Sequence, residues 1–399
     1  MKKVLYISGS IGMGHVTRDL AIANELRQRN PDVEISWLAA HPASQAIKDA
    51  GGNLLPESAR YSDLTLIYEK TSHGFQIDSI KAFFKAGFKE PSHRFEVFQA
   101  ATSREHFDLI IGDESNEILW KFKNPSLKKV PFVFITDFIG YSATTNNPLD
   151  RLLNYFSNRS LYGTKDLKKP AVEMDMCLFV GEEEDIPNTK LGFMLPKCRE
   201  WARARCKFIG YVFPFHPSEY EDKAKVRVSL GYGKEPLVIC SIGGTSIGKE
   251  LLLLCGGSYQ LIKKKLPEVR MILVCGPRLS AESLGVPQGV EVKGYVPNLY
   301  QHFAASDLAI VQGGGTTTME LAALRRPFLY FPLENHFEQQ LLVAGALKRH
   351  GAGVNMTYSK TTPESLAEAI ISNIGKEVSY APIPADGAQK AAQLISQLL

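Results

Sequence analysis

A run of three glycines and three threonines at residues 313–318 offers the clearest chemistry in the sequence. It follows a short apolar run at residues 307–311 and opens a stretch with helical spacing. A helix that begins directly after glycines exposes free backbone N–H groups and the positive end of its dipole, and this combination binds anions, above all phosphate. The candidate phosphate ligands are Gly314, Gly315, Thr316 and Thr317.

Groups suited to a sugar follow the same glycines. Glu320 lies one turn inside the expected helix, where its carboxylate can accept hydrogen bonds from sugar hydroxyls. The loop at residues 332–340 gathers amide and carboxylate side chains, among them Glu338, Gln339 and Gln340. Such a density of polar groups suits a polyhydroxylated ligand. Phosphate beside hydroxyls indicates a nucleotide sugar.

A second glycine loop, at residues 9–14, follows the first apolar run of the chain and ends at His15. It is not a Walker-type phosphate loop, because His15 and Val16 stand where that motif requires lysine and serine or threonine. It also departs from the dinucleotide fingerprint GxGxxG, since its glycines follow the order GxxGxG. A histidine at the end of such a loop can serve as a general base near neutral pH. A helix-capping or core histidine is the alternative.

A carboxylate that orients this histidine is expected at the end of a neighbouring strand. The apolar run at residues 109–111 leads into Asp113, on the same edge of the expected sheet as His15. A carboxylate on the far ring nitrogen would fix the tautomer of the histidine and stabilise its protonated form, as in hydrolase triads. Two alternatives stay open: Asp113 caps the helix that follows it, or Asp137 is the partner of His15 instead.

Short apolar runs alternate with helical stretches along the whole chain. The expected strands are residues 4–8, 34–39, 109–111, 132–135, 177–180, 237–241, 271–275 and 308–311. The expected helices include residues 17–29, 44–50, 79–104 with a break near Pro91, 247–264 and 299–304. This alternation is typical of parallel sheets with right-handed crossovers. We therefore predict an α/β protein with two doubly wound Rossmann-like domains that face each other across a cleft.

Proline and charge content suggest the domain boundaries. Residues 1–212 are expected to form an N-terminal domain and residues 233–380 a C-terminal domain, with a linker at residues 213–232. The amphipathic tail, residues 381–399, is expected to pack back on the N-terminal domain.

Composition argues against several classes of protein. A net charge of +4, and no run of Lys or Arg that resembles a nucleic-acid-binding arm, argue against nucleic-acid binding. The six cysteines form no CxxC pair, so they are expected to be buried thiols rather than metal ligands or disulfides. The sequence contains no run of 18 apolar residues and begins without a signal-peptide core. We therefore expect a cytoplasmic location.

The sequence resembles the GT-B glycosyltransferases that use nucleotide-diphosphate sugars. The likeness covers most of the chain and is sharpest at residues 9–15, 241–245 and 307–340. It is similar to the plant and bacterial small-molecule glucosyltransferases and to the peptidoglycan lipid-intermediate N-acetylglucosaminyltransferase. The resemblance implies that the N-terminal domain binds an acceptor and the C-terminal domain binds the sugar donor.

The resemblance also assigns roles to residues of both domains. His15 is implied to be the catalytic base, with Asp113 as its partner. The residues implied to bind the donor are Gly243, Thr245, Val296, Gln312, Gly314, Gly315, Thr316, Thr317, Glu320, Glu338, Gln339 and Gln340. Within this set Glu320 would hold the ribose, and the backbone around Val296 would read a uracil base. The polar residues from Glu338 onward would hold the donor sugar.

The sequence departs from the family pattern in the donor site. Gln312 stands where the glucosyltransferases have a histidine and the lipid-intermediate enzyme has an arginine, and Glu338 stands where aspartate is commoner. Retaining GT-B enzymes carry a glutamate eight residues before the one that matches Glu320, and that position is again Gln312. The resemblance thus implies an inverting transferase without a bound metal or other cofactor. It would move a UDP-linked sugar to a hydroxyl of a lipid-linked or cell-envelope glycan, or of a small molecule.

Three other functions fit parts of the sequence. A nucleotide-sugar hydrolase of the same fold has a GxGHxxR signature, which residues 12–18 match, and water would replace the acceptor. A catalytically silent nucleotide-sugar-binding protein would keep the donor site without turnover. A GT-B-like epimerase would be expected to carry more carboxylates around the glycines at residues 313–315.

Two basic stretches with aromatic residues are candidates for contact with an anionic acceptor or with lipid. One is residues 195–207, which contains Trp201, and the other places Phe83, Phe84 and Phe88 among lysines. Basic residues beside aromatic ones bind anionic headgroups, so either stretch would make the protein peripheral to a membrane. A solvated, charged helix face is the alternative.

Overall fold

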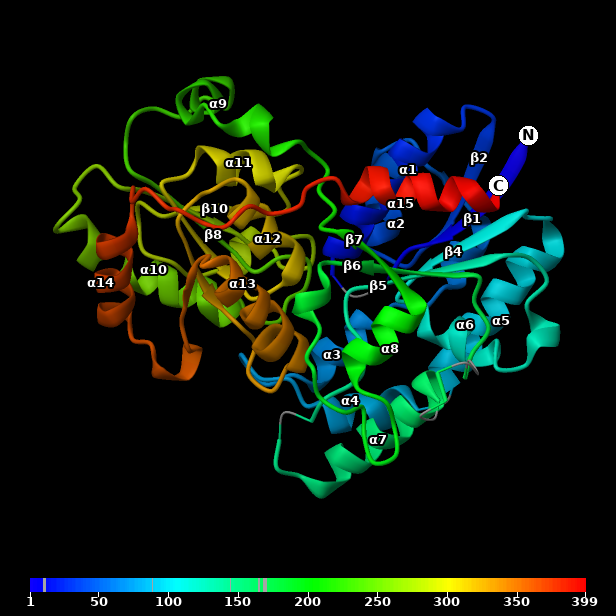
Figure 1. Ribbon diagram of the computed structural model, residues 1–399. Coiled ribbons are helices and arrows are strands. Elements are labelled where there is room, and N and C mark those ends of the chain that lie inside the picture. The colour runs from blue at the N-terminus through cyan, green and yellow to red at the C-terminus, as the bar shows by residue number, and fades with distance from the viewer. Residues whose placement is uncertain (10–11, 88, 144, 164–165, 168–170) are drawn as a thin grey trace. The chain divides into compact units, whose positions relative to one another are not determined.

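The chain folds as two compact units, each built from discontinuous segments (Figure 1). The computed structural model describes residues 1–9, 12–87, 89–143, 145–163, 166–167 and 171–399. Unit 1 comprises Met1–Thr71, Asp78–Pro214 and Pro384–Leu399. Unit 2 comprises Ser72–Ile77 and Phe215–Ile383.

Unit 1 contains a seven-stranded parallel sheet with the strand order β3-β2-β1-β4-β5-β6-β7. The strands are β1 (Lys2–Ile7), β2 (Val33–Leu38), β3 (Asn53–Leu54), β4 (Leu109–Asp113), β5 (Phe132–Thr136), β6 (Met176–Val180) and β7 (Cys206–Gly210). Its helices are α1 (Gly14–Arg29), α2 (Ala43–Asp49), α3 (Thr65–Thr71), α4 (Ser79–Ala86), α5 (Lys89–Arg104), α6 (Asn116–Lys121), α7 (Pro148–Tyr162), α8 (Cys198–Arg205) and α15 (Gly387–Ile395).

Both faces of this sheet are covered. Successive residues of a strand point to opposite faces, and in β4 Leu109 and Ile111 join one apolar cluster while Ile110 joins another. Strands buried on both faces read as near-continuous apolar runs, which is why the sequence reveals them. Helix α15 packs on α1 (Figure 1). It completes one of the two clusters, in which Ala391 and Ile395 are fully buried.

Unit 2 repeats this architecture with a six-stranded parallel sheet of order β10-β9-β8-β11-β12-β13. The strands are β8 (Leu237–Ser241), β9 (Arg270–Val274), β10 (Glu291–Lys293), β11 (Leu308–Gln312), β12 (Phe328–Phe331) and β13 (Val354–Asn355). The helices are α9 (Lys223–Ser229), α10 (Lys249–Lys263), α11 (Leu299–Ala305), α12 (Gly315–Ala323), α13 (Ala344–His350) and α14 (Pro363–Asn373), with a π-helical turn at Glu338–Val343. The prediction of two doubly wound Rossmann-like domains is confirmed.

The strand order reverses direction at one point in each sheet. In unit 1 the reversal lies between β1 and β4, and in unit 2 it lies between β8 and β11. Ligands of such sheets bind beyond the carboxyl ends of the strands at this point. The glycine loops singled out in the sequence follow β1, β8 and β11, so all three lie at a switch point.

The segment Ser72–Ile77 belongs to unit 2, although it lies between α3 and α4 of unit 1. Its backbone pairs with the loop after β12: Glu334 N donates to Phe75 O at 2.9 Å, and Ile77 N donates to Glu334 O at 3.1 Å. The buried ring of Phe75 stacks on Tyr358, with centroids 4.6 Å apart. The predicted N-terminal domain, residues 1–212, includes this segment.

Two other details differ from the sequence-based expectation. The helical stretch 79–104 breaks after α4 at Gly87, which has a left-handed φ of 53°. Pro91 instead lies in the first turn of α5, where its missing N–H costs no hydrogen bond. The expected linker is folded, because residues 217–229 form a 3₁₀ turn and α9, which packs on α11.

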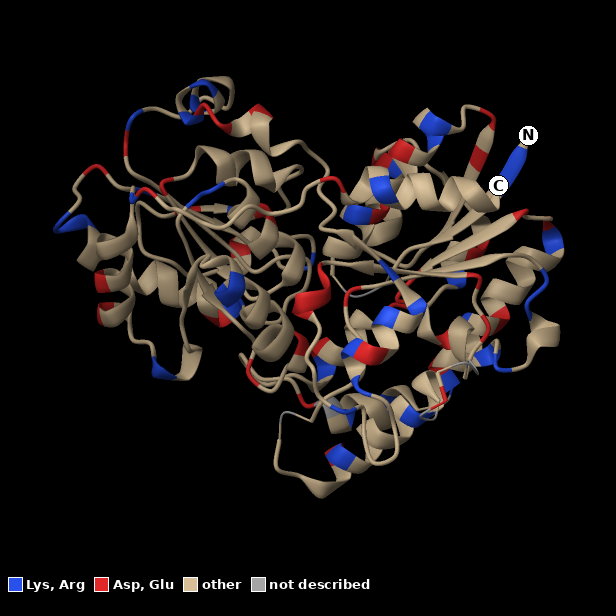
Figure 2. Ribbon diagram, viewed as in Figure 1, with Lys and Arg blue, Asp and Glu red and all other residues tan. Residues whose placement is uncertain are grey.

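Charged residues of both signs are interspersed over the helices and loops of each unit (Figure 2). Among the described residues, none of the helices is long and apolar enough to cross a membrane.

Candidate functional site

His15 lies in the first turn of α1, directly after the loop that follows β1. A Cβ on Gly9 would lie 2.8 Å from Cγ of His15, so only a glycine lets the backbone pass this close to the imidazole. Gly12 has a left-handed φ of 76° and turns the loop into the helix. Ser10 and Ile11 of this loop lie outside the described residues.

The structure brings together His15 and Asp113, the pair expected from the sequence. Asp113 is the last residue of β4 and is fully buried. Its Oδ2 lies 3.3 Å from Nδ1 of His15. The parallel pairing of β1 with β4, in which Ile7 opposes Gly112, carries both residues to the same edge of the sheet.

Arg18 lies at the centre of this cluster; it is the arginine of the GxGHxxR pattern at residues 12–18 but was not among the predicted site residues. Its Nε donates to Asp113 Oδ2 at 2.8 Å and its Nη2 donates to Asp113 Oδ1 at 2.5 Å. Its Nη1 donates to Asp137, so both candidate carboxylates share one guanidinium. Nη2 also lies 2.9 Å from Nδ1 of His15. The signal in the sequence was the spacing, because residues i and i+3 share a helix face.

The charges of the cluster shift the pKa values of its members. Burial and the charge of Arg18 lower the pKa of His15, but Asp113 and Asp137 outweigh them, and the pKa of His15 is raised. Burial opposes ionisation of Asp113, yet Arg18 and His15 hold its pKa well below the usual range. Burial and the neighbouring Asp137 and Asp113 raise the pKa of Glu114 to about 8. One carboxyl of the cluster is therefore protonated at neutral pH.

In unit 2 the helix α12 begins at the carboxyl end of β11. Its N-cap, Gly314, supplies no side-chain cap, and the first N–H groups of an α-helix have no partner within the helix. Gly314, Gly315, Thr316 and Thr317 are only half-buried, so these groups can reach a ligand. A Cβ on Gly313 would lie 2.8 Å from Cα of Pro332, which explains a glycine where β11 meets the loop after β12.

Glu320 lies on the buried side of α12, with 7% of its surface exposed. Burial alone raises the pKa of its carboxyl to about 8. A buried carboxyl at neutral charge is ready to exchange hydrogen bonds with a ligand hydroxyl.

The glutamines expected at the donor are bonded to loop backbone: Gln312 to the loop before α10, and Gln339 and Gln340 to the loop after β12. The Nε2 of Gln312 donates to Ile247 O. The Oε1 of Gln339 accepts from Leu333 N at 2.8 Å, and the Nε2 of Gln340 donates to Leu333 O at 3.0 Å. These amides therefore shape the loops around the site. Their role was invisible in the sequence, which shows composition but not the backbone groups that each side chain satisfies.

Glu338 is half-buried and opens the π-helical turn Glu338–Val343. Such turns are rare and recur at functional sites.

The remaining donor residues lie in the loops after β8 and before α11. Gly243 has a left-handed φ of 80°, and Thr245 is half-buried in the same loop. A Cβ on Gly276, after β9, would lie 2.2 Å from Gly243 O, so the two loops pass in direct backbone contact. Val296 is half-buried in the loop that leads to Asn298, the left-handed N-cap of α11. Because β8 pairs with β11, the loop of Gly243 adjoins the start of α12.

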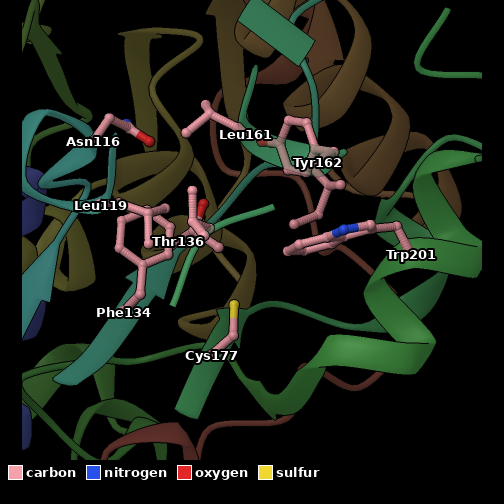
Figure 3. Close-up of a pocket in the computed structure, with 10 residues that line it drawn as sticks. Asn116, Leu119, Phe134, Thr136, Leu161, Tyr162, Cys177 and Trp201 are labelled. Atoms are coloured by element: carbon pink, nitrogen blue, oxygen red, sulfur yellow. The ribbon is translucent and has the colours of Figure 1, made fainter. Parts of the chain in front are cut away.

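A small cavity lies within unit 1 (Figure 3). It lies among Phe134, Tyr162, Cys177 and Trp201, and has a volume of about 10 Å³. This is room for about one water molecule, so the cavity does not hold a substrate.

The sequence of this chain is similar to those of known glycosyltransferases. Residues 238–398 match the glycosyltransferase family 28 C-terminal domain. An uncharacterized glycosyltransferase of Methanopyrus kandleri is 28% identical over 48% of this chain and 54% of its own length. The UDP-N-acetylglucosamine–N-acetylmuramyl-(pentapeptide) pyrophosphoryl-undecaprenol N-acetylglucosamine transferase of Clostridioides difficile is 24% identical over 94% of this chain and 82% of its own length.

A solved structure shares the fold of the whole chain. The glycotransferase of kitacinnamycin superposes with a TM-score of 0.62 at 16% identity, over 100% of this chain and 98% of its own. The fold is that of the GT-B class, and the sequence relatives are named glycosyltransferases, so the protein is similar to the glycosyltransferases of this class. Its second half carries the C-terminal domain of glycosyltransferase family 28.

Proposed function

We propose that this protein transfers a sugar from a nucleotide-diphosphate sugar, with a uridine nucleotide as the expected donor, to an acceptor hydroxyl with inversion at the anomeric carbon. The observation that carries the proposal is the start of α12. Free N–H groups at Gly315, Thr316 and Thr317 lie one turn from the buried Glu320. The N–H groups can bind the diphosphate of a nucleotide, and the carboxyl of Glu320 can bind a hydroxyl of its ribose.

The start of α12 offers a way to stabilise the leaving group without a metal. When the glycosidic bond breaks, negative charge grows on the diphosphate. Oriented N–H groups and the helix dipole stabilise this charge without reorganising. We therefore assign the charge stabilisation to the protein backbone, and the proposed reaction needs no bound metal or other cofactor.

His15 supplies the base in this proposal. Its ring accepts the proton of the acceptor hydroxyl as the oxygen attacks, and Asp113 then stabilises the imidazolium that forms. The raised pKa of His15 agrees with a group that becomes protonated during the reaction. One histidine as base, with Gln312 where the retaining enzymes carry a glutamate, supports inversion in a single displacement.

An exposed apolar patch on unit 1 supports peripheral contact with a membrane. We define this patch as Phe83 and Phe84 of α4, Leu149, Leu152 and Phe156 of α7, and Phe193 and Met194. α4 contacts α7, and the loop of Phe193 lies on α7 through the hydrogen bond from Asn158 Nδ2 to Leu191 O. Phe84 is 61% exposed and Phe193 is 79% exposed.

Basic side chains accompany this apolar patch. Lys81, Lys85 and Arg151 are exposed on the same two helices, α4 and α7. Apolar side chains bordered by cations suit an interface of anionic lipid. An acceptor carried on a lipid would be delivered at such a surface. The patch differs from the stretch 195–207, where Trp201 is buried in the core of unit 1.

The proposal is tested by measuring release of nucleoside diphosphate from a panel of nucleotide sugars, with and without an extract of lipid-linked glycans. Transfer that depends on the extract supports a glycosyltransferase with a lipid-linked acceptor. Equal release in the absence of any acceptor would instead establish a nucleotide-sugar hydrolase. Tight donor binding without release in either condition would leave a nucleotide-binding protein and overturn the proposed reaction.

A further inference from the structure

Arg18 is placed to control the protonation of His15. It lies one turn further along α1 and is only 3% exposed. Its guanidinium bonds both oxygens of Asp113 and one oxygen of Asp137, which fixes its position. From that position Nη2 lies 2.9 Å from Nδ1 of His15. The reaction proposed above assigns no role to this contact.

The contact between the two side chains has one consistent arrangement of protons. A guanidinium has five N–H donors and no acceptor, and it remains charged in proteins. Nδ1 of His15 must therefore accept from Nη2, and a neutral imidazole then carries its proton on Nε2. The competing contact from Nδ1 to Asp113 Oδ2 is longer, at 3.3 Å. That oxygen already accepts from Nε of Arg18 at 2.8 Å.

We propose that Arg18 is a positioning residue that holds His15 of the free protein in the tautomer with the proton on Nε2. In this form Nε2 can donate a proton but cannot accept one. The base form carries its proton on Nδ1 and donates it to Asp113, which requires the bond from Arg18 to break. In that change Nε2 loses a proton to water and Nδ1 gains one from water, so charge is conserved.

The effect of this change of tautomer on catalysis rests on the proposed function. The tautomer of His15 in the free protein does not depend on any substrate. The titratable groups around His15 are Arg18, Asp113 and Asp137, with the carboxyls of Glu114 and Asp19, whose pKa values are raised by burial, next to these groups. Arg18 is the cation of this group. Its removal frees Asp113 to accept from Nδ1 and leaves the carboxylates to favour a protonated imidazole. We expect the proton of neutral His15 to move to Nδ1 in such a variant.

The experiment is two-bond ¹H–¹⁵N NMR of the full chain labelled with ¹⁵N-histidine, which reports the tautomer and the pKa of each ring. The His15 signals are assigned as those missing from His15→Gln. The wild type should show the Nε2–H pattern at high pH. Arg18→Gln should show the Nδ1–H pattern and a pKa higher by about one unit or more, since a cation within hydrogen-bond distance is lost.

Two further variants keep the test decisive. Removal of a buried arginine leaves carboxylates unpaired and can prevent folding, so Arg18→Gln is also combined with Asp137→Asn, which removes one of them. Arg29→Gln, exposed in the last turn of α1, is the matched control and should leave both tautomer and pKa unchanged.

An Nδ1–H pattern in the wild type would overturn the proposal. An Nε2–H pattern that persists in the folded double variant would also overturn it. Because no substrate is present, a confirmed tautomer would stand even if the transferase reaction were disproved.

Discussion

The side-chain amide of Gln312 donates to the backbone carbonyl of Ile247 and so joins the end of β11 to the loop before α10. A Cβ on Gly248 would lie 2.1 Å from this amide nitrogen, so the loop backbone passes directly over it. Gln312 is 9% exposed. The residue that stands before the triple glycine thus fixes the loop that contains Gly243 and Thr245.

Loss of this bond should destabilise unit 2. Gln312→Ala leaves the carbonyl of Ile247 without its partner, which costs about 1–3 kcal/mol for a buried group. The free energy of unfolding in urea measures the loss. Gln260→Ala, at an exposed position of α10, is the control and should change stability by less than about 0.5 kcal/mol. Equal effects of the two substitutions would show that the amide of Gln312 does not hold the loop.

Substitution of His15 should separate chemistry from donor binding. His15→Ala removes the proposed base, and the loss of a general base typically lowers the rate about 10²- to 10⁴-fold. The donor loops belong to unit 2, so the dissociation constant of the nucleotide, measured by calorimetry, should stay within about twofold of the wild type. His93→Ala, on the exposed surface of α5, is the control. Retained turnover in His15→Ala would remove His15 from the mechanism.

A carboxylate at the start of α12 should raise stability while it weakens donor binding. Thr316→Glu places a negative charge at the positive end of the helix dipole, which stabilises a helix by about 0.3–1 kcal/mol. The same charge would repel a diphosphate, and we expect at least about a tenfold loss of affinity. Thr316→Gln, similar in size and uncharged, should show neither effect. Unchanged affinity in the glutamate variant would mean that the diphosphate binds elsewhere.

The buried Glu320 should give stability a pH dependence of defined sign. Its folded pKa of about 8 lies above the value of about 4.3 expected in the unfolded chain. Between these values the native state holds a proton that the unfolded state has lost. The contribution of Glu320 is therefore complete below about pH 4 and falls as the pH rises towards 8. Glu320→Gln should remove this decline, and identical pH profiles of unfolding would contradict the shift.

Donor binding offers a second test of the same carboxyl. If ribose hydroxyls donate to Glu320, they favour its ionised form, and binding at pH 7 should release a proton. Calorimetry in buffers of different ionisation enthalpy measures the release. The Glu320→Gln variant should bind the nucleotide without releasing a proton. If the wild type releases no proton either, the ribose hydroxyls do not donate to Glu320.

Contact with lipid should depend on the apolar patch of unit 1. Phe84→Ser combined with Phe156→Ser removes two rings that are 61% and 57% exposed. Sedimentation with vesicles of phosphatidylglycerol should fall at least about tenfold, and added salt should weaken binding by the wild type. Val228→Ser, at a 79% exposed position of unit 2, is the control. If the wild-type protein does not sediment with anionic vesicles, the proposed contact with a membrane is wrong.

Much of this fold follows from local patterns in the sequence. β8 coincides with the apolar run predicted at residues 237–241, because a strand covered on both faces must be apolar throughout. The pairing of His15 with Asp113 followed from the rule that neighbouring parallel strands end at one edge. The sequence did not reveal the role of a side chain whose hydrogen-bond partners lie far away along the chain. Arg18 resembles a surface residue of a helix until Asp113 and Asp137, 95 and 119 residues away, are placed beside it.

The segment Ser72–Ile77 and the helix α15 have a consequence for how this chain is made and divided. The polypeptide passes from one unit to the other after Thr71, Ile77, Pro214 and Ile383. Division of the chain near residue 214 therefore yields an N-terminal fragment that lacks α15. The C-terminal fragment lacks the backbone of Ser72–Ile77, which pairs with Glu334. On the ribosome, unit 1 cannot complete its core before residues 384–399 have been made. Synthesis, folding and expression in fragments therefore all depend on this distant segment.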